Sequence, residues 1–323
     1  MQLSKPTTVF RRFGGMGDIL MLFGACKFIS QFTNVVIHTI PLYEKLCRRC
    51  PYIADVIVGD YHGEVIDLGD TSHSFNQTLH QTDTYLADFD LDKLATAEDK
   101  EIVLFNTKAE IEKIATLECT RKKRFLLHPG LTDPARTWPY HYWEELAKLL
   151  MPYGDVIIIG STKAEKTVLL DFIEGTWNLV NRLTFMETVA LMKTSTILIS
   201  ADAGPIQLAG ATDIGIVGFY TLIPGRNRLP YRHGKQGWNS IALEADCSFF
   251  PCFHKTHDKD FMKPVQEALD ARQISYDVVL RNWCPKNEMY SCMRKITPLM
   301  VFNSCMELVK QNQQASPIGD LNV

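Results

Sequence analysis

The side chains best suited to chemistry on an anionic ligand lie in short loops, each between an apolar run and a helix-like segment. The first loop is Arg12-Phe13-Gly14-Gly15-Met16-Gly17-Asp18. Its glycines allow a tight turn and a close approach of the backbone to a ligand, and Asp18 stands where a helix begins. Aspartate is also a common helix cap. The pattern therefore permits either a functional carboxylate or a cap.

Two familiar nucleotide-binding motifs do not fit this first loop. The run Gly15-x-Gly17-x-x-Leu20 lacks the third glycine of the dinucleotide fingerprint. No Gly-Lys-Ser/Thr follows, as a phosphate-binding P-loop requires. A dehydrogenase is thus disfavoured, and a P-loop nucleotidase is excluded.

Later loops add cations, a hydroxyl and a second carboxylate. Residues 128–139 offer backbone donors and Arg136 to a diphosphate, although their prolines also suit a simple turn with a solvated arginine. Residues 200–205 repeat the strand-loop-helix design, with Asp202 as a functional carboxylate or an ordinary helix cap. The loop 220–232 carries three arginines that either complement phosphates or are exposed: Arg226, Arg228 and Arg232.

Apolar runs and helical patterns alternate along the chain, which predicts parallel sheets covered by helices on both faces. We expect strands at 7–13, 35–38, 56–58, 65–68, 102–105, 125–128, 156–160, 197–201, 214–220 and 241–243. We expect helices at 18–32, 42–50, 108–117, 140–151, 163–174, 185–193 and 205–211. The alternation restarts after the basic run 121–124, so we predict domains at 1–122 and 123–312 and a polar tail at 313–323. Two such domains form a cleft at the carboxyl ends of their sheets.

The overall composition narrows the class of protein. Lys and Arg number 34 against 37 Asp and Glu, a net charge of −3, so no global positive field favours nucleic acid or an anionic membrane. With 46% hydrophobic and 22% charged residues, the chain is not intrinsically disordered. No apolar run is long enough for stable membrane insertion, and the first residues do not resemble a signal peptide. We therefore expect a cytoplasmic protein.

The nine cysteines suggest one local site together with scattered core thiols. Cys247-x4-Cys252 and Cys284-x7-Cys292 could supply four thiolates to a tetrahedral zinc or iron ion. The same residues could instead be separate buried thiols. His254 and His257 are alternative ligands, and Cys305 fits a helix core.

Taken in order, these segments resemble glycosyltransferase family 9, the ADP-heptose:lipopolysaccharide heptosyltransferases. Four blocks carry the resemblance: Gly17-Asp18 with its helix; His128-Pro129-Gly130 through Arg136-x-Trp138-Pro139 to Trp143-Glu144-Glu145-Leu146; the strand closing in Gly160-Ser161; and Ser200-Ala201-Asp202-Ala203-Gly204. The resemblance implies a GT-B fold, in which two Rossmann-like domains face each other across a cleft. The N-terminal domain would bind an acceptor, and the C-terminal domain a nucleotide-activated sugar.

The resemblance also implies roles for individual residues. Asp18 matches the catalytic base, Arg136 the basic phosphate-binding residue, and Asp202 the acidic residue near the donor sugar. Gly204 would let the diphosphate approach a helix N-terminus. Position 207, usually histidine in the family, is Gln207 here, which leaves a phosphate contact through the amide. The full set expected at the donor and its phosphates is Gly17, His128, Gly130, Thr132, Arg136, Ser161, Asp202, Ala203, Gly204 and Gln207.

The function that this resemblance implies is inverting transfer of heptose or a related sugar from a nucleoside diphosphate, with an ADP-sugar favoured. The acceptor could be a glycan, a protein side chain or a modified base, and no catalytic metal is expected. Autotransporter heptosyltransferases, a branch of the family, hold a structural iron with cysteines of this region, and the run 292–298 (Cys-Met-Arg-Lys-Ile-Thr-Pro) is similar to theirs. Cys247, Cys252, Cys284 and Cys292 are therefore the expected metal ligands. A non-catalytic nucleotide-sugar-binding protein on the same fold is the alternative.

Overall fold

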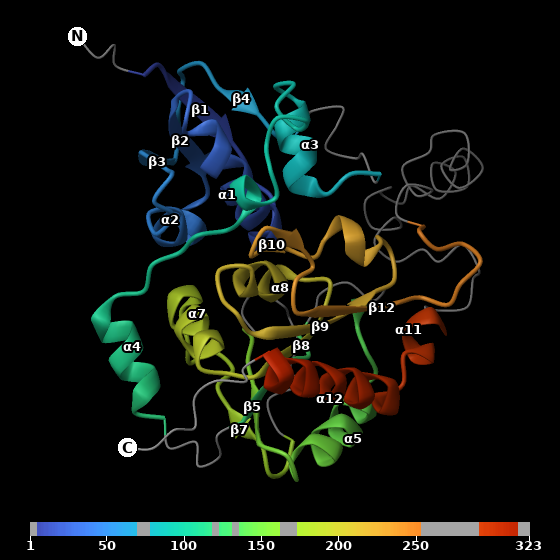
Figure 1. The fold of residues 1–323 in the computed structure, drawn as a ribbon. Helices are drawn as coiled ribbons and strands as arrows, with labels where there is room; N and C mark the ends of the chain where they lie inside the picture. Colours follow the sequence, from blue (N-terminus) through green and yellow to red (C-terminus); the bar gives the residue numbers. More distant parts are fainter. Residues whose placement is uncertain are drawn as a thin grey trace, which may run out of the picture.

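The computed structural model describes residues 5–69, 78–117, 123–130, 136–161, 173–252 and 291–315. The first half of the chain builds a four-stranded parallel sheet in the order β3-β2-β1-β4 (Figure 1). Its strands are β1 (Thr7–Arg11), β2 (Asn34–Thr39), β3 (Asp55–Val58) and β4 (Ile66–Asp67). Three helices accompany this sheet: α1 (Met16–Ile29), α2 (Pro41–Cys47) and α3 (Gln81–Ala87). A short 3-10 turn, η1 (Glu98–Lys100), packs on α1.

The second half builds a six-stranded parallel sheet in the order β12-β9-β8-β5-β6-β7. Its strands are β5 (Arg124–His128), β6 (Asp155–Ile158), β7 (Trp177–Asn178), β8 (Ile197–Ala201), β9 (Gly215–Tyr220) and β12 (Ser240–Glu244). Every residue of β6, β8 and β9 is buried, as expected of parallel strands covered on both faces. The α/β class with two parallel sheets is therefore confirmed.

Helices and a small hairpin complete the second half. The helices are α5 (Tyr140–Leu150), α7 (Phe185–Lys193), α8 (Gly204–Ala209), α11 (Ser291–Lys295) and α12 (Pro298–Ala315). α12 packs beside α5 and against β9. The strands β10 (Tyr231–Arg232) and β11 (Lys235–Gln236) pair antiparallel after the turn η3 (Gly225–Asn227). Neither this hairpin nor α3 was expected from the sequence.

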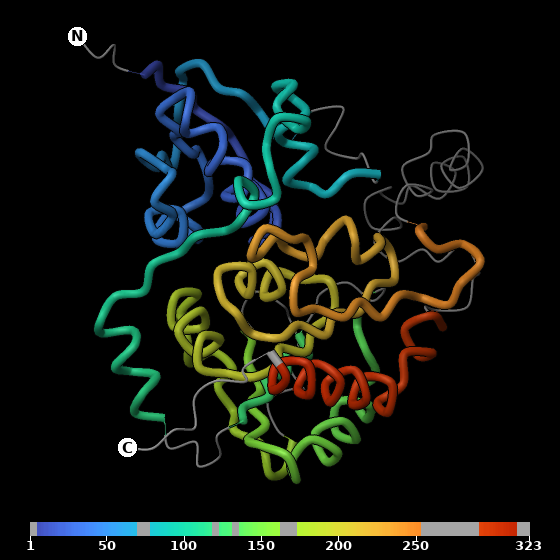
Figure 2. Tube along the Cα trace, in the orientation of Figure 1, coloured from blue at the N-terminus to red at the C-terminus, as the bar shows by residue number. Residues whose placement is uncertain are grey.

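The connection between the halves corrects one expectation. Residues 102–105 form no strand, although Ile102 and Leu104 are buried as the alternating pattern requires. Figure 2 traces this segment from the first half down to α4 (Lys108–Ala115), which packs against α7 of the second half. A Cβ at Gly210 would lie 3.0 Å from the Ile102 side chain. Ile102 and Leu104 are therefore buried by side-chain packing, without a strand partner for their backbone.

Several expectations concern residues outside the described ranges. The helix expected at 163–174 falls largely there, as do the first two residues of the basic run 121–124. At the C-terminal end, α12 continues to Ala315, so the polar tail expected from residue 313 begins inside this helix. The domain boundary after residue 122 stays a prediction.

The two halves touch over a substantial apolar surface. One cluster of buried hydrophobic side chains runs from Phe10 and Leu22 of the first half to Leu126 and Leu198 of the second. Helices α1 and α8 pack against each other, and their first residues meet at the carboxyl ends of both sheets. The loops that follow the strands of both sheets therefore face one common space.

Candidate active site

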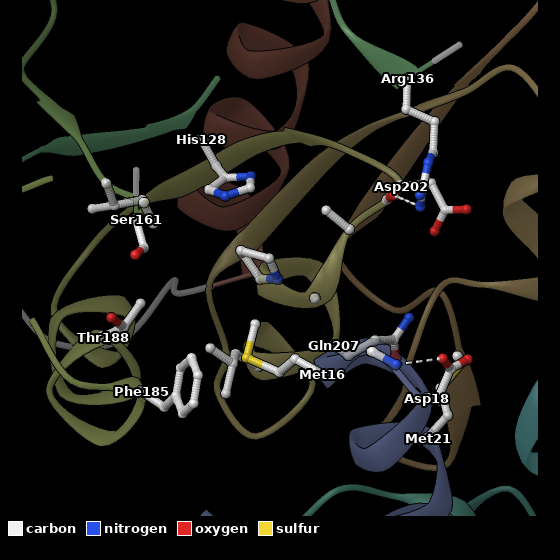
Figure 3. A pocket seen from close by; sticks show the side chains of 18 of the residues that line it. Met16, Asp18, Met21, His128, Arg136, Ser161, Phe185, Thr188, Asp202 and Gln207 are labelled. Carbon is white, nitrogen blue, oxygen red and sulfur yellow. Dashed lines mark hydrogen bonds between the residues drawn. The ribbon is translucent and has the colours of Figure 1, made fainter. Parts of the chain in front are cut away.

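A cavity of about 520 Å³ lies where the loops of the two sheets meet. Its walls come from the start of α1 in the first half and from the loops after β5, β6, β8 and β9 in the second. Figure 3 shows Asp18 on α1 facing the side of the cavity that carries Arg136 and Asp202. All described residues expected at the donor and base sites line it except Gly130, which is buried beside β5. Thr132 lies outside the described residues.

Asp18 is the third residue of α1, and its carboxylate is held on one side. Oδ2 accepts a hydrogen bond from the Gly15 N–H at 3.0 Å and lies 3.4 Å from Nη2 of Arg12. Oδ1 takes no hydrogen bond from any described residue. The side chain keeps 32% of its surface exposed. Asp18 therefore caps its helix with one oxygen and leaves the other available to a ligand.

The side chain of Arg12 is held in place by a buried tyrosine. Its Nε donates to the hydroxyl of Tyr85 at 3.2 Å, and Tyr85, on α3, has no exposed surface. Burial, together with the nearby Asp18 carboxylate, raises the pKa of Tyr85 well above its ordinary value. Tyr85 thus stays a neutral phenol at physiological pH, and Arg12 is the cation beside Asp18.

On the opposite wall, two guanidinium groups flank Asp202. Nη1 of Arg136 donates to the backbone carbonyl of Asp202 at 2.9 Å. Nε of Arg228 lies 3.9 Å from Oδ2 of Asp202, and both side chains are about 15% exposed. These contacts place two positive charges on one side of the cavity, an arrangement that suits a diphosphate.

Among the three arginines of the loop 220–232, only Arg228 lines the cavity. Arg226 is exposed. Arg232 is buried and donates to the carbonyl oxygens of Thr212 and Ile214 at 3.0 and 2.7 Å, and burial lowers its pKa to about 10. No signal in the sequence distinguishes these three side chains, because only the course of the loop decides which one enters the cavity.

His128 and Ser161 lie at the ends of neighbouring strands. His128 is buried, and its Nδ1 lies 3.1 Å from Oγ of Ser200, its partner in the register of β5 and β8. Gly160 has a φ of 141°, which glycine adopts readily, and the chain turns there so that Ser161 enters the cavity wall. Both residues therefore line the cavity from the floor formed by the second sheet.

The halves approach each other at two glycines in the cavity wall, and only at Gly204 would a side chain obstruct them. A Cβ at Gly17 would lie 3.7 Å from the Cα of Gly204. A Cβ at Gly204 would lie only 2.3 Å from Cε of Met16. The close approach at Gly204 is thus made by a side chain of the first half, and Ala203 lies next to it in the wall.

Gln207 is 2% exposed and lines the cavity from α8. Its Nε2 donates to the backbone carbonyl of Arg228, and its Oε1 has no partner among the described residues. One of the two N–H groups of the amide is therefore used within the protein, and the phosphate contact expected through the amide stays a prediction.

Further lining residues were not expected from the sequence. Mostly apolar side chains form much of the remaining wall: Met16, Met21, Leu42, Tyr43, Ile159, Leu179, Leu183, Phe185, Thr188, Leu222 and Ile223. They occupy ordinary helical or strand-end positions. Nothing in their type or spacing distinguishes them from core residues.

The cysteine segment is only partly described. Cys247, Cys252 and Cys292 are partly exposed, whereas Cys284 lies outside the described residues, as do His254 and His257. Nζ of Lys295 on α11 binds Oδ2 of Asp246 at 2.9 Å, which brings the helix of Cys292 beside the segment of Cys247. Within the described ranges, no group of three or more His, Cys, Asp or Glu side chains is placed to hold a metal ion.

The model of glycosyltransferase family 9 (heptosyltransferase) matches residues 72–259, more than half of the chain. No curated protein matches. None of the helices in the described ranges combines the length and the apolar composition that a membrane span needs.

Three solved structures illustrate the fold. The family 9 glycosyl transferase from Veillonella parvula DSM 2008 has 13% identity and a TM-score of 0.69, over 96% of this chain and 99% of that one. ADP-heptose lps heptosyltransferase II from E. coli has 13% identity and a TM-score of 0.60, over 95% and 100%. The iron-containing dodecameric glycosyltransferase TibC from enterotoxigenic E. coli H10407 has 17% identity and a TM-score of 0.64, over 97% and 78%. The GT-B fold is thus confirmed, and the chain belongs to glycosyltransferase family 9 and is a glycosyltransferase.

Proposed function

We propose that this protein transfers a heptose or related sugar from a nucleoside diphosphate to an acceptor hydroxyl, with inversion at the anomeric carbon. One observation carries the proposal. The carboxylate of Asp18 and the guanidinium groups of Arg136 and Arg228 line one cavity from opposite halves of the chain. A base on one wall and cations on the other match the two charge changes of such a displacement.

In the proposed step, the acceptor oxygen forms a bond to the anomeric carbon while the bond from that carbon to the β-phosphate oxygen breaks. Oδ1 of Asp18 takes the hydroxyl proton, because Oδ2 is already held by Gly15 and Arg12. The electron pair leaves with the nucleoside diphosphate. Attack from the face opposite the leaving group inverts the anomeric configuration.

The leaving diphosphate gains negative charge, and we assign its stabilisation to Arg136 and Arg228. Both side chains are largely buried or held by the loop after β8, so they need little reorganisation when the charge develops. Asp202 contacts both of them, because its backbone carbonyl accepts from Arg136 and its carboxylate lies 3.9 Å from Nε of Arg228. Its carboxylate keeps Arg228 in the cavity and would orient the donor.

An ADP-sugar is the donor that the relatives favour. TibC has been solved in complex with ADP-D-beta-D-heptose, and E. coli heptosyltransferase WaaC with ADP. The apolar part of the wall, which includes Leu183 and Phe185, offers a surface for a nucleobase. The acceptor is proposed only as a hydroxyl, on a glycan, a protein side chain or a modified base.

The test is release of nucleoside diphosphate from ADP-heptose, ADP-glucose, UDP-glucose and GDP-mannose, each with and without candidate acceptors. We expect an ADP-sugar to be consumed faster when an acceptor is present, and the product to carry the inverted anomeric configuration by NMR. The Asp18→Asn protein is the matched control. Binding of a nucleotide sugar without any turnover, by a folded wild-type protein, would instead support a non-catalytic binding protein.

We also propose a structural iron or zinc site built from Cys247, Cys252, Cys284 and Cys292. The support is the Lys295–Asp246 ion pair, which joins the two ends of the cysteine segment, and the iron content of TibC. A four-thiolate ion has no open coordination position, so the site would stabilise the second half of the chain.

A further inference from the structure

Gln207 holds a buried acceptor atom that no described residue satisfies. The side chain is 2% exposed, lines the cavity and carries Oε1 without a hydrogen-bond partner in the described part of the chain. Buried amide oxygens are nearly always hydrogen-bonded, because an unmet acceptor away from water costs free energy. An atom of this kind in a cavity wall indicates a ligand group that completes it.

The orientation of the amide is fixed by its surroundings. Nε2 donates to the backbone carbonyl oxygen of Arg228. Exchanging the nitrogen and oxygen would set two acceptors against each other with no proton between them. Gln207 therefore has one N–H committed to the protein and an acceptor oxygen without a described partner, on a side chain that lines the cavity.

The chemistry of that oxygen excludes an ionised phosphate as its partner. The oxygens of an ionised diphosphate and Oε1 are all acceptors, so they repel, whereas a hydroxyl can donate. The two cations that suit the phosphates, Arg136 and Arg228, are separate side chains of the same wall. The group that meets Gln207 must donate a hydrogen bond, as a hydroxyl does.

The neighbours of Gln207 point to the transferred sugar. A Cβ at Gly17, the residue before Asp18, would lie 3.8 Å from Cγ of Gln207. Gln207 thus lies beside the start of α1, which carries the proposed base, and the base must act next to the anomeric carbon. We propose that Oε1 of Gln207 accepts a hydrogen bond from one hydroxyl of the donor sugar and so selects the sugar. This inference rests on the proposed function.

Binding measurements test the inference without depending on turnover. Calorimetry gives the dissociation constants of ADP-heptose, ADP-glucose, UDP-glucose and GDP-mannose and of the matching diphosphates, for the wild type and Gln207→Leu. We expect the variant to bind the best nucleotide sugar about 10 to 100 times more weakly, and the diphosphate within about threefold of wild type. Circular dichroism and melting temperature check that the variant is folded.

Deoxy donors provide a second readout with the wild-type protein alone. The wild type should bind one monodeoxy analogue of the best nucleotide sugar more weakly than the parent sugar, by the same factor that Gln207→Leu loses. Gln207→Leu should bind that analogue and the parent sugar equally well. The other monodeoxy analogues should still be weakened by the variant.

Several results would overturn the inference. An equal loss for the diphosphate would place Gln207 on the nucleotide. An unchanged donor affinity with a raised KM for the acceptor would place it on the acceptor hydroxyl. A wild type that binds no tested nucleotide sugar more tightly than its diphosphate would also contradict it. Sugar-dependent binding through Gln207 without transfer would contradict only the proposed function, and transfer that Gln207→Leu leaves unchanged would contradict only this inference.

Discussion

Nη2 of Arg12 lies 3.4 Å from Oδ2 of Asp18, the oxygen that also accepts the N–H of Gly15. Together, Arg12 and Gly15 hold the Asp18 carboxylate from the side of the first sheet. The same guanidinium donates to the buried hydroxyl of Tyr85, so its own position is set by the core of the first half. Oδ1, which takes no hydrogen bond from the described residues, is the oxygen that can receive a proton.

Asp18→Asn should lower turnover by roughly 10² to 10⁴, the usual contribution of general base catalysis. The fold and the affinity for the donor should change little, since the amide keeps the shape of the side chain. Steady-state kinetics and donor calorimetry check both. Asp67→Asn is the matched control, because Asp67 pairs with Arg11 at 3.6 Å outside the cavity wall. Turnover of Asp18→Asn within a few-fold of wild type would reduce Asp18 to a helix cap.

Arg12→Gln should lower kcat by about tenfold in the wild-type background, because one restraint on the Asp18 carboxylate is lost. In the Asp18→Asn background the same change should have little further effect, and Arg12→Lys should restore part of the activity. A double-mutant cycle on kcat measures this coupling. Equal losses in both backgrounds would show that Arg12 acts only on the fold.

Arg136→Ala and Arg228→Ala should each weaken binding of the nucleoside diphosphate roughly 10- to 100-fold, the size of a lost hydrogen bond to a charged group. Calorimetry with ADP measures the effect. Arg226→Ala is the control on the same loop, since Arg226 is exposed and outside the cavity wall. If all three variants bind ADP like the wild type, the diphosphate does not lie beside these arginines.

His80 should make the protein less stable in mild acid. Burial lowers the pKa of His80 from 6.5 to about 4, with Arg228 and Lys100 adding to the shift and Asp83 opposing it. Between these values the unfolded chain binds a proton that the native protein does not. The free energy of unfolding should therefore fall by up to about 3 kcal/mol as the pH drops from about 7 to 4.

Urea unfolding at several pH values tests this dependence on His80. The variant His80→Asn keeps an acceptor for the Thr82 N–H, which His80 now caps at 3.1 Å, and removes the titrating ring. Its free energy of unfolding should fall less than that of the wild type over the same range. Identical slopes for the two proteins would contradict the assignment.

Cys292→Ser should release metal and lower the melting temperature, because an ion bound only in the native state stabilises that state. Elemental analysis of protein purified without chelator should give near-stoichiometric iron or zinc for the wild type. Cys26→Ser, a change at a buried thiol in α1, should leave the metal content unaltered. Less than about 0.2 metal atoms per wild-type chain would contradict the metal site and leave these cysteines as ordinary thiols.

Much of the secondary structure could be predicted from local sequence patterns, whereas contacts between segments far apart in the sequence could not. Hydrophobic periodicity located β5, β8 and α7, because burial of one face imposes a spacing on the sequence. The same periodicity at Ile102 and Leu104 predicted a strand that the structure does not contain. Alternation reports which side chains are buried, and says nothing about whether a neighbouring strand exists to take the backbone hydrogen bonds.

The candidate site shows the same limit at the level of single atoms. Loop position and glycine content marked the segments of Asp18, Arg136 and Asp202, which line the cavity. Sequence could not choose Arg228 from its neighbours, nor show that the amide nitrogen of Gln207 is used by a carbonyl 21 residues later. Such choices depend on long-range contacts, which local spacing does not encode.

The shared space between Met16 and Gly204 couples the composition of the two halves of the chain. A Cβ at position 204 would lie 2.3 Å from Cε and 3.1 Å from Cβ of Met16, so a larger residue there would require the Met16 side chain to move. Chimeras that join the first half of this chain to the second half of another family member should therefore disturb the Met16 side chain least when the incoming half carries glycine at the position of Gly204.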